Sequence, residues 1–159
     1  SINLLLSLVK TDPTSLKVHA SLATAYAKLS ELYLHPKKLT PRNVMTWIPQ
    51  EYKSSFMENA FLKYSNKAIE ELQILQELSP NDPWTLAQLA NQYRLQEKIE
   101  QEITHCEKLL DLSPENKDLM LQLGVLYFKK GQSGKGLKMY QRLLSNSSDK
   151  ARELIAHYE

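Results

Sequence analysis

Cysteine is nearly absent from this chain of 159 residues. Cys106 has no second cysteine to pair with, so no disulfide can form within the chain. This usage fits a reducing compartment, and we expect a cytoplasmic protein. Long apolar runs are lacking too, because the stretch from Ile2 to Val9 falls far short of the ~20 residues of a transmembrane helix. We therefore expect no membrane span.

Charge of one sign and glycine are also scarce. The formal net charge is only +2, whereas sequence-independent nucleic-acid binders carry a strong basic excess, so we expect no nucleic-acid partner. The chain has 4 glycines against many Ala, Leu, Lys, Glu and Gln residues, a balance that favours helix over sheet. The length suits one domain, which can bury roughly 70% of its unfolded surface without a disulfide or a metal.

Residue types that serve in catalysis are present, but their spacing does not match a catalytic site. No two histidines stand at metal-ligand spacing, and Cys106 falls on a predicted buried stripe. The run Gly131–Gly136 contains a Gly-Lys pair, as a phosphate loop does. A phosphate loop also needs Gly five residues before that pair and Ser or Thr directly after it, but Lys129 and Gly136 occupy these places. Acidic pairs such as Glu70–Glu71 and Glu100–Glu102 fall on predicted polar faces, where we expect them to be solvated. We therefore predict a non-enzymatic protein with no cofactor, no metal and no small-molecule substrate.

A repeated pattern is the informative feature of the sequence. Its members are Leu22, Ala23 and Tyr26 after Pro13; Leu89, Ala90 and Tyr93 after Pro80; and Leu123, Gly124 and Tyr127 after Pro114. The last two prolines lie 34 residues apart. Leu and Tyr four residues apart share one helix face, and the small residue beside the Leu lets a neighbouring helix come close. A proline after the last turn of a helix stops it.

This pattern resembles the tetratricopeptide repeat, whose period is 34 and whose motif includes L-G-x-x-Y and a late Pro. The resemblance covers residues 81–148 closely, and residues 13–30 and 61–80 well. One departure is Glu102, which stands where the family has a small residue; Ala68 and Gly136 fit that place in the other pairs. The resemblance implies stacked helix pairs with a concave face that binds peptides or helices of other proteins.

We predict an all-α fold, a solenoid of about three helix pairs within a single domain, residues 1–159. Its parts are the tail of a preceding helix at 1–12, repeats at 13–80, 81–114 and 115–148, and a capping helix at 149–159. Predicted helices cover approximately residues 2–10, 15–34, 51–78, 83–96, 116–130, 134–146 and 149–158, with a further one marked by Ile99, Ile103 and Leu110.

The first repeat carries an insertion. Pro13 and Pro80 are 67 residues apart, which is 33 more than one period. We place the insertion at about 35–50, between two lengthened helices, as the tip of a projecting hairpin. Met45 and Trp47 at this tip are candidate protein contacts, and a homodimer through the hairpin is one hypothesis. A degenerate extra repeat is the competing interpretation.

In the family that this sequence resembles, the first helix of each pair lines the concave face. Carried onto this chain, that face gives the candidate peptide-binding residues Thr24, Trp84, Gln88, Asn91, Arg94, Leu95, Leu121, Gln122, Val125, Phe128 and Lys129. The clamp that some members use for the acidic tails of heat-shock chaperones is not matched, because Asp118 stands where it needs a cation. We expect a partner segment of mixed character with a mild acidic preference. The alternative for Trp84 and Phe128 is packing between repeats.

The expected function is a protein–protein interaction scaffold or adaptor that binds a peptide or helix of a partner protein. Two alternatives remain open at this point. One is a bacterial secretion-type chaperone that holds a translocator or an effector in its groove. The other is a fragment of a larger solenoid that serves as an assembly factor.

Overall fold

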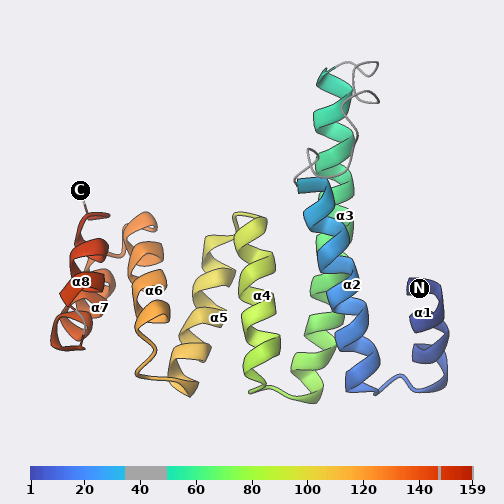
Figure 1. Ribbon diagram of the computed structural model, residues 1–159, viewed down its shortest axis with the longest axis horizontal. Coiled ribbons are helices and arrows are strands. Elements are labelled where there is room, and N and C mark those ends of the chain that lie inside the picture. The colour runs from blue at the N-terminus through green and yellow to red at the C-terminus, as the bar shows by residue number, and fades with distance from the viewer. Residues whose placement is uncertain (35–49, 147, 159) are drawn as a thin grey trace. The chain divides into compact units, whose positions relative to one another are not determined.

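The computed structural model describes residues 1–34, 50–146 and 148–158, and in these ranges the regular structure is helical, with no strand (Figure 1). The helices are α1 (Ile2–Thr11), α2 (Leu16–Leu34), α3 (Gln50–Leu78), α4 (Pro83–Leu95), α5 (Ile99–Leu112), α6 (Lys117–Lys129), α7 (Ser133–Asn146) and α8 (Ser148–Ile155). The predicted all-α class is confirmed. None of these helices combines the length and the apolar character that crossing a bilayer demands.

The predicted helix boundaries agree with the structure to within one or two residues, except at the C-terminal end. The last helix was predicted to reach residue 158, but α8 ends at Ile155. Tyr158 then donates its backbone N–H to the carbonyl of Ile155, three residues back, in a tight turn. Its ring packs edge-on against Phe128 with the ring centres 5.1 Å apart. This contact accounts for the difference: Tyr158, whose spacing suggested a longer helix, packs its ring against Phe128 from a turn instead.

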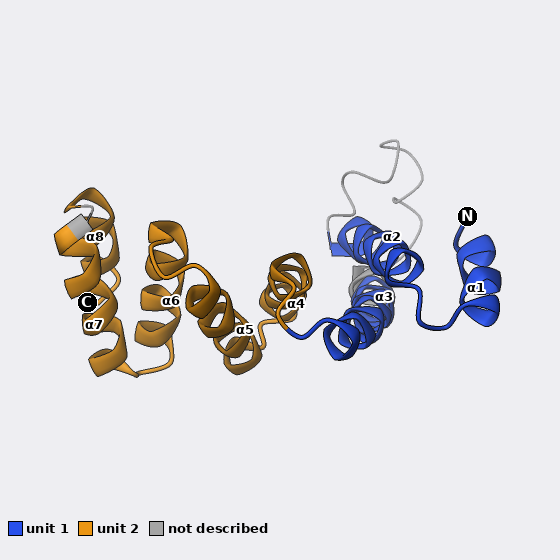
Figure 2. Cartoon of the chain, turned by 90° about the horizontal axis from the view of Figure 1, so that it is seen from below, with its two compact units in different colours: residues 1–80 blue, residues 81–159 orange. Residues whose placement is uncertain are grey.

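The chain divides into two compact units, unit 1 (Ser1–Pro80) and unit 2 (Asn81–Glu159) (Figure 2). In unit 1, α2 and α3 lie side by side as a long helical pair (Figure 1). Leu22, Tyr26 and Ala68 form the buried centre of this pair. Helix α1 covers it with partly buried apolar side chains. The connector between α2 and α3, and with it Met45 and Trp47, lies outside the described residues.

A row of aromatic rings joins the upper turns of α2 and α3. Tyr64 stacks on Tyr26 and on Tyr33, with ring centres 6.5 and 5.5 Å apart, and Tyr33 meets Phe56 edge-on. The ammonium group of Lys67 lies 5.3 Å from the centre of the Tyr26 ring, a cation–π distance. These contacts explain why both helices extend beyond the length of the helices in unit 2: side chains hold them together along the added turns.

Unit 2 contains α4 to α8, and the 34-residue period of the sequence recurs in its backbone. Asp82 and Asn116 are the N-caps of α4 and α6, and their side-chain oxygens accept backbone N–H bonds from Thr85 and Leu119 at 2.8 and 3.1 Å. The turns that follow these helices match as well. Each has one residue with positive φ, Glu97 at 58° in the first turn and Gly131 at 75° in the second.

The residues of the repeated pattern form the buried core of both units. Leu22, Leu89 and Leu123 are all 0% exposed. Gly124 of α6 is the small residue of the third repeat, and it allows α8 to come close. A Cβ added at Gly124 would lie 2.5 Å from Cδ2 of Leu154 in α8. Gly136 in α7 has the same role, because a Cβ there would meet the ring of Phe128 at 2.3 Å. The sequence pattern thus identifies the positions at which helices touch.

Candidate peptide-binding pocket

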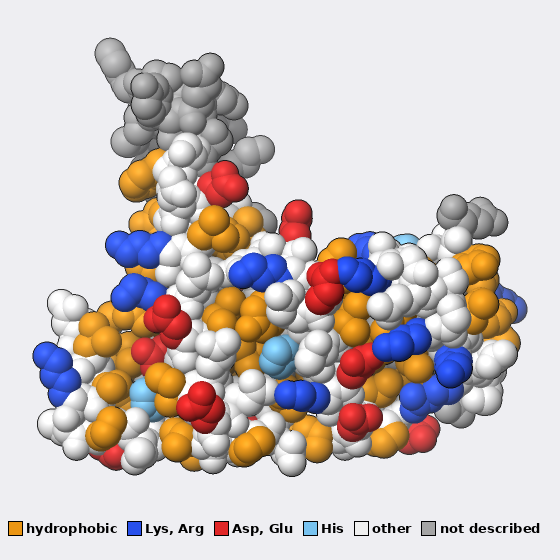
Figure 3. Space-filling view, turned by 180° about the vertical axis from the view of Figure 1, so that it is seen from behind, with side chains coloured by type: hydrophobic (Ala, Val, Ile, Leu, Met, Phe, Trp, Pro, Cys, Tyr) orange, Lys and Arg blue, Asp and Glu red, His pale blue; other side chains and the backbone are white. Residues whose placement is uncertain are grey.

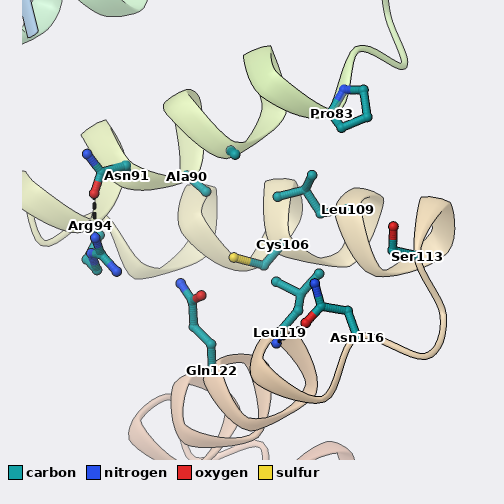
Figure 4. A pocket seen from close by; sticks show the side chains of 11 residues that line it. Pro83, Ala90, Asn91, Arg94, Cys106, Leu109, Ser113, Asn116, Leu119 and Gln122 are labelled. Carbon is teal, nitrogen blue, oxygen red and sulfur yellow. Dashed lines mark hydrogen bonds between the residues drawn. The ribbon is translucent and has the colours of Figure 1, made fainter.

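Helices α4, α5 and α6 of unit 2 surround a pocket of about 420 Å³ (Figure 4). Its apolar lining consists of Pro83, Ala87, Ala90, Cys106, Leu109 and Leu119, and its polar lining of Asn91, Arg94, Ser113, Asn116 and Gln122. A pocket of mainly apolar walls with a few convergent polar groups is typical of a ligand-binding site.

The local sequence explains why this pocket forms. The residues that α4 contributes are Pro83, Ala87, Ala90, Asn91 and Arg94; apart from the adjacent pair Ala90–Asn91 they are three or four positions apart, so they share one face of that helix. Two of them, Ala87 and Ala90, have small side chains that leave space above α5. Cys106 and Leu109 of α5 close the pocket from below, while α6 begins at its edge with the N-cap Asn116. The small residues of α4 therefore create the hollow, and α5 forms its floor.

Three polar side chains gather at one end of the pocket. Arg94 donates a hydrogen bond from Nη2 to Oδ1 of Asn91, as Figure 4 shows. Gln122 reaches from α6 and donates from Nε2 to Oε1 of Glu102 at 2.9 Å. Among the described residues, no carboxylate forms an ion pair with Arg94. The guanidinium is therefore a positive charge with unused donors at the rim of the pocket.

Glu102 was expected on a solvated face, and this expectation is wrong. Its side chain is 3% exposed and accepts the bond from Gln122. Glu71 of the other acidic pair is also largely buried, at 16% exposure, and lies 2.6 Å from Nδ1 of His19. Buried carboxylates persist only with hydrogen-bonding partners. In both cases the partner comes from another helix, and so the charge pattern of one helix could not reveal it.

Cys106 borders the pocket but is only 1% exposed. Burial is the main cause that raises the pKa of its thiol, the negative charges of Glu102 and Glu107 act in the same direction and the positive charge of Arg94 acts against them, and together they bring the pKa to about 12. The thiol is therefore neutral at physiological pH, and a neutral thiol is a poor nucleophile. This environment fits the predicted inert thiol and gives the pocket no activated cysteine.

We expect Cys106 to resist alkylation as long as unit 2 is folded. In native protein at neutral pH, iodoacetamide should modify it at least about tenfold more slowly than in urea-unfolded protein, because the thiolate is disfavoured and the sulfur is covered. Mass spectrometry of quenched time points would measure both rates. Equal rates in the two states would contradict the burial and the raised pKa.

The structure brings some of the predicted groove residues together and separates others. Asn91, Arg94 and Gln122 line the pocket. Trp84, Gln88 and Leu95 belong to α4 but do not line it, and Trp84 is 41% exposed. Leu121, Val125 and Phe128 of α6 pack, partly buried, against the core of unit 2. Lys129 is exposed at the end of α6. Thr24 is exposed in unit 1, where its hydroxyl donates to the carbonyl of Ala20.

The sequence interpretation missed the residues that the second helix of the pair contributes. Cys106 and Leu109 of α5 and Ser113, the residue directly after this helix, line the pocket, although only the first helices were expected to do so. Their spacing of three and four residues marks one helix face. Of these residues, Cys106 was expected on a buried stripe, because apolar residues at helical spacing usually face the interior.

Charges of both signs cover the surface around these elements. On the face shown in Figure 3, Lys and Arg side chains are interspersed with Asp and Glu in each unit. Charged side chains of unit 2 also form ion pairs, such as Lys150 with Asp118 and Lys135 with Glu107. The described residues contain no group of three or more His, Cys, Asp or Glu placed to bind a metal ion.

No protein-family model matches this chain, and a search of curated proteins finds no match to its sequence.

Proposed function

We propose that this chain is a non-enzymatic scaffold or adaptor of tetratricopeptide-repeat type, which binds a peptide segment or helix of a partner protein in the pocket of unit 2. The period of 34 residues supports the repeat assignment, because caps, turns and core leucines recur at that interval in unit 2. Repeats of this kind stack into surfaces that bind other proteins.

The observation that carries the proposal is the composition of the pocket. Three residues expected on a peptide-binding face, Asn91, Arg94 and Gln122, come from two helices and meet at one pocket. Amide groups can pair with a peptide backbone, and apolar walls can hold its side chains.

The ionisable groups of the pocket lining favour binding over catalysis. They are Arg94 and Cys106. Arginine stays protonated in proteins and so does not serve as a general acid or base. The Cys106 thiol is buried and neutral, with a pKa raised to about 12, mainly by burial. Neither group is suited to proton transfer or nucleophilic attack at neutral pH.

Photo-crosslinking would test the binding role. We expect a photoreactive amino acid at position 91 to form a discrete adduct with a partner protein in the native host. Position 108 is the control, because Lys108 is exposed on α5 and does not line the pocket. The adduct would be identified by mass spectrometry and the partner then purified. Equal adducts from both positions, or adducts from position 108 alone, would contradict the proposal.

Steric filling of the pocket gives a second measurement on the purified partner. Ala87 lines the pocket and is exposed, so Ala87→Leu would occupy it without disturbing the core. We expect affinity to fall about tenfold or more, since displaced contacts at a binding centre cost at least ~1–2 kcal/mol. Ala156→Leu, at an exposed position outside the pocket, is the matched control. Calorimetry would measure both, and circular dichroism would verify that both variants fold.

A further inference from the structure

We propose that the pocket of unit 2 selects an acidic–apolar segment, in which a large apolar side chain fills the centre and a neighbouring carboxylate binds Arg94. This inference rests on the proposed function and specifies the chemistry of its partner.

The centre of the pocket suits an apolar side chain. Ala87, Ala90, Leu109 and Leu119 line it and carry no hydrogen-bonding side chain. A cavity of ~150 Å³ already accommodates a benzene-sized group, and this pocket is about 420 Å³. It can therefore hold a large aliphatic or aromatic side chain together with part of the adjoining backbone.

The end of the pocket formed by Asn91, Arg94 and Gln122 suits an anion. A guanidinium has five N–H donors, and the structure uses one Arg94 nitrogen to bind Asn91. The side-chain oxygen of Asn91 accepts that bond, so its NH₂ group stays available as a donor beside the guanidinium. Asn91 and Arg94 thus both offer hydrogen-bond donors, and Arg94 lacks a carboxylate partner within the described residues. Paired donors of this kind bind carboxylates well.

Nearby charge favours a carboxylate over a more highly charged anion. Glu102, which is 3% exposed, binds Gln122 at the same end of the pocket. Gln122 lines the pocket together with Arg94, so the carboxylate that it binds places a negative charge near this end. A singly charged group can approach Arg94 against this repulsion, whereas a phosphate carries about −2 and is opposed more strongly.

The opposite end of the pocket offers no charge that could bind the acidic side chain. It is formed by Ser113 and Asn116, which are neutral, and the Asn116 oxygen is already used to cap α6. No charged side chain lines that end. The acidic residue of the partner therefore lies toward the C-terminal end of α4, and the apolar side chain lies toward its middle.

Selection from a displayed library of short random peptides would test the inference on the full chain. We expect the enriched peptides to share an apolar residue next to Asp or Glu. Replacing that acid by its amide in a synthetic peptide should weaken binding to the natural chain about tenfold. For Arg94→Gln the same replacement should have little effect, because the pair is already broken. Arg152→Gln is the control, since Arg152 is 82% exposed on α8 and does not line the pocket.

The outcomes separate this inference from the proposed function. One outcome is a set of enriched peptides that bind the natural chain and lose affinity for the Ala87→Leu variant. If these peptides lack an acidic residue, the inference is overturned and the binding role is left intact. The same holds if the acid-to-amide change weakens binding to Arg94→Gln as much as to the natural chain. If no peptide binds the natural chain more tightly than it binds the Ala87→Leu variant, the pocket does not bind peptides, and both the proposed function and the inference fail.

Discussion

Replacing Gly124 by alanine should lower the free energy of unfolding by about 1–3 kcal/mol, the usual cost of overpacking a core. The new Cβ would lie 2.5 Å from Cδ2 and 2.6 Å from Cδ1 of Leu154. Atoms cannot approach this closely, so one of them must move. Leu154 is 0% exposed and cannot turn toward solvent. The Leu154 side chain would therefore have to rearrange within the core, or α8 would have to shift away from α6.

Gly134→Ala is the matched control for this variant. Gly134 lies in α7, and a Cβ added there would meet nothing within 4 Å. In the middle of a helix alanine is favoured over glycine by roughly 0.5–1 kcal/mol, and at Gly134, the second residue of α7, the gain should be at most that. We therefore expect the two substitutions to have opposite signs, although both replace a helical glycine by alanine. Urea unfolding followed by circular dichroism would measure both.

A double-mutant cycle would show that the contact with Leu154 is the cause. Leu154→Ala alone should cost about 2–5 kcal/mol, because it leaves a cavity in the core. In the double variant, the alanine at position 124 no longer clashes and fills part of that cavity. The combined cost should then be smaller than the sum of the single costs by about 0.5–3 kcal/mol. Additive costs would mean that Gly124 is needed for another reason.

Local rules account for the part of the fold that the sequence predicts. Asp82 followed by Pro83 begins α4 where expected, because a capping side chain and a proline at the first position act within one turn. The small residues of the repeat likewise identify the helix contacts at Gly124 and Gly136. The turn of the Tyr158 backbone could not be predicted in this way, because its ring packs on Phe128, thirty residues earlier in the chain.

The candidate site was predictable only in part, and for a similar reason. The family resemblance indicates the first-helix residues Asn91 and Arg94, which line the pocket. The contribution of α5 depends on how deeply that helix lies beneath its neighbours, which in turn depends on the size of Ala87 and Ala90. The burial of Glu102 depends on Gln122, a partner in the next helix. Such pairings involve two helices, so no single helical pattern contains them.

His19 is the other position at which we expect a large effect. It is 2% exposed in α2, and both ring nitrogens face hydrogen-bond acceptors. Nδ1 lies 2.6 Å from a carboxylate oxygen of Glu71 in α3, and Nε2 lies 2.9 Å from the carbonyl oxygen of Pro13. Only the imidazolium form can donate to both acceptors. In that form the ring ties α2 to α3 and to the turn that follows α1.

The same geometry sets the direction of the pKa shift. Burial lowers the pKa of His19, but the bonds to Glu71 and Pro13 and the negative charges of Glu71 and Asp12 outweigh it, so the pKa is raised. Because the folded pKa lies above the unfolded value of about 6.5, the charged ring stabilises the fold fully below that value. This stabilisation is lost as the pH rises through the folded pKa.

We therefore expect His19→Gln to cost about 1–3 kcal/mol near pH ~5.5, the range for losing a buried, charge-assisted hydrogen bond. Glutamine does not titrate, so the difference from the natural chain should shrink steadily toward pH ~9. Hydrogen exchange read by mass spectrometry would locate the loss in α1 and α2, with α6 of unit 2 unchanged. His157→Gln, at an exposed position, controls for the removal of a histidine. A cost that stays constant from pH ~5.5 to ~9 would show that the His19 ring contributes by packing, and that its charge does not hold the turn.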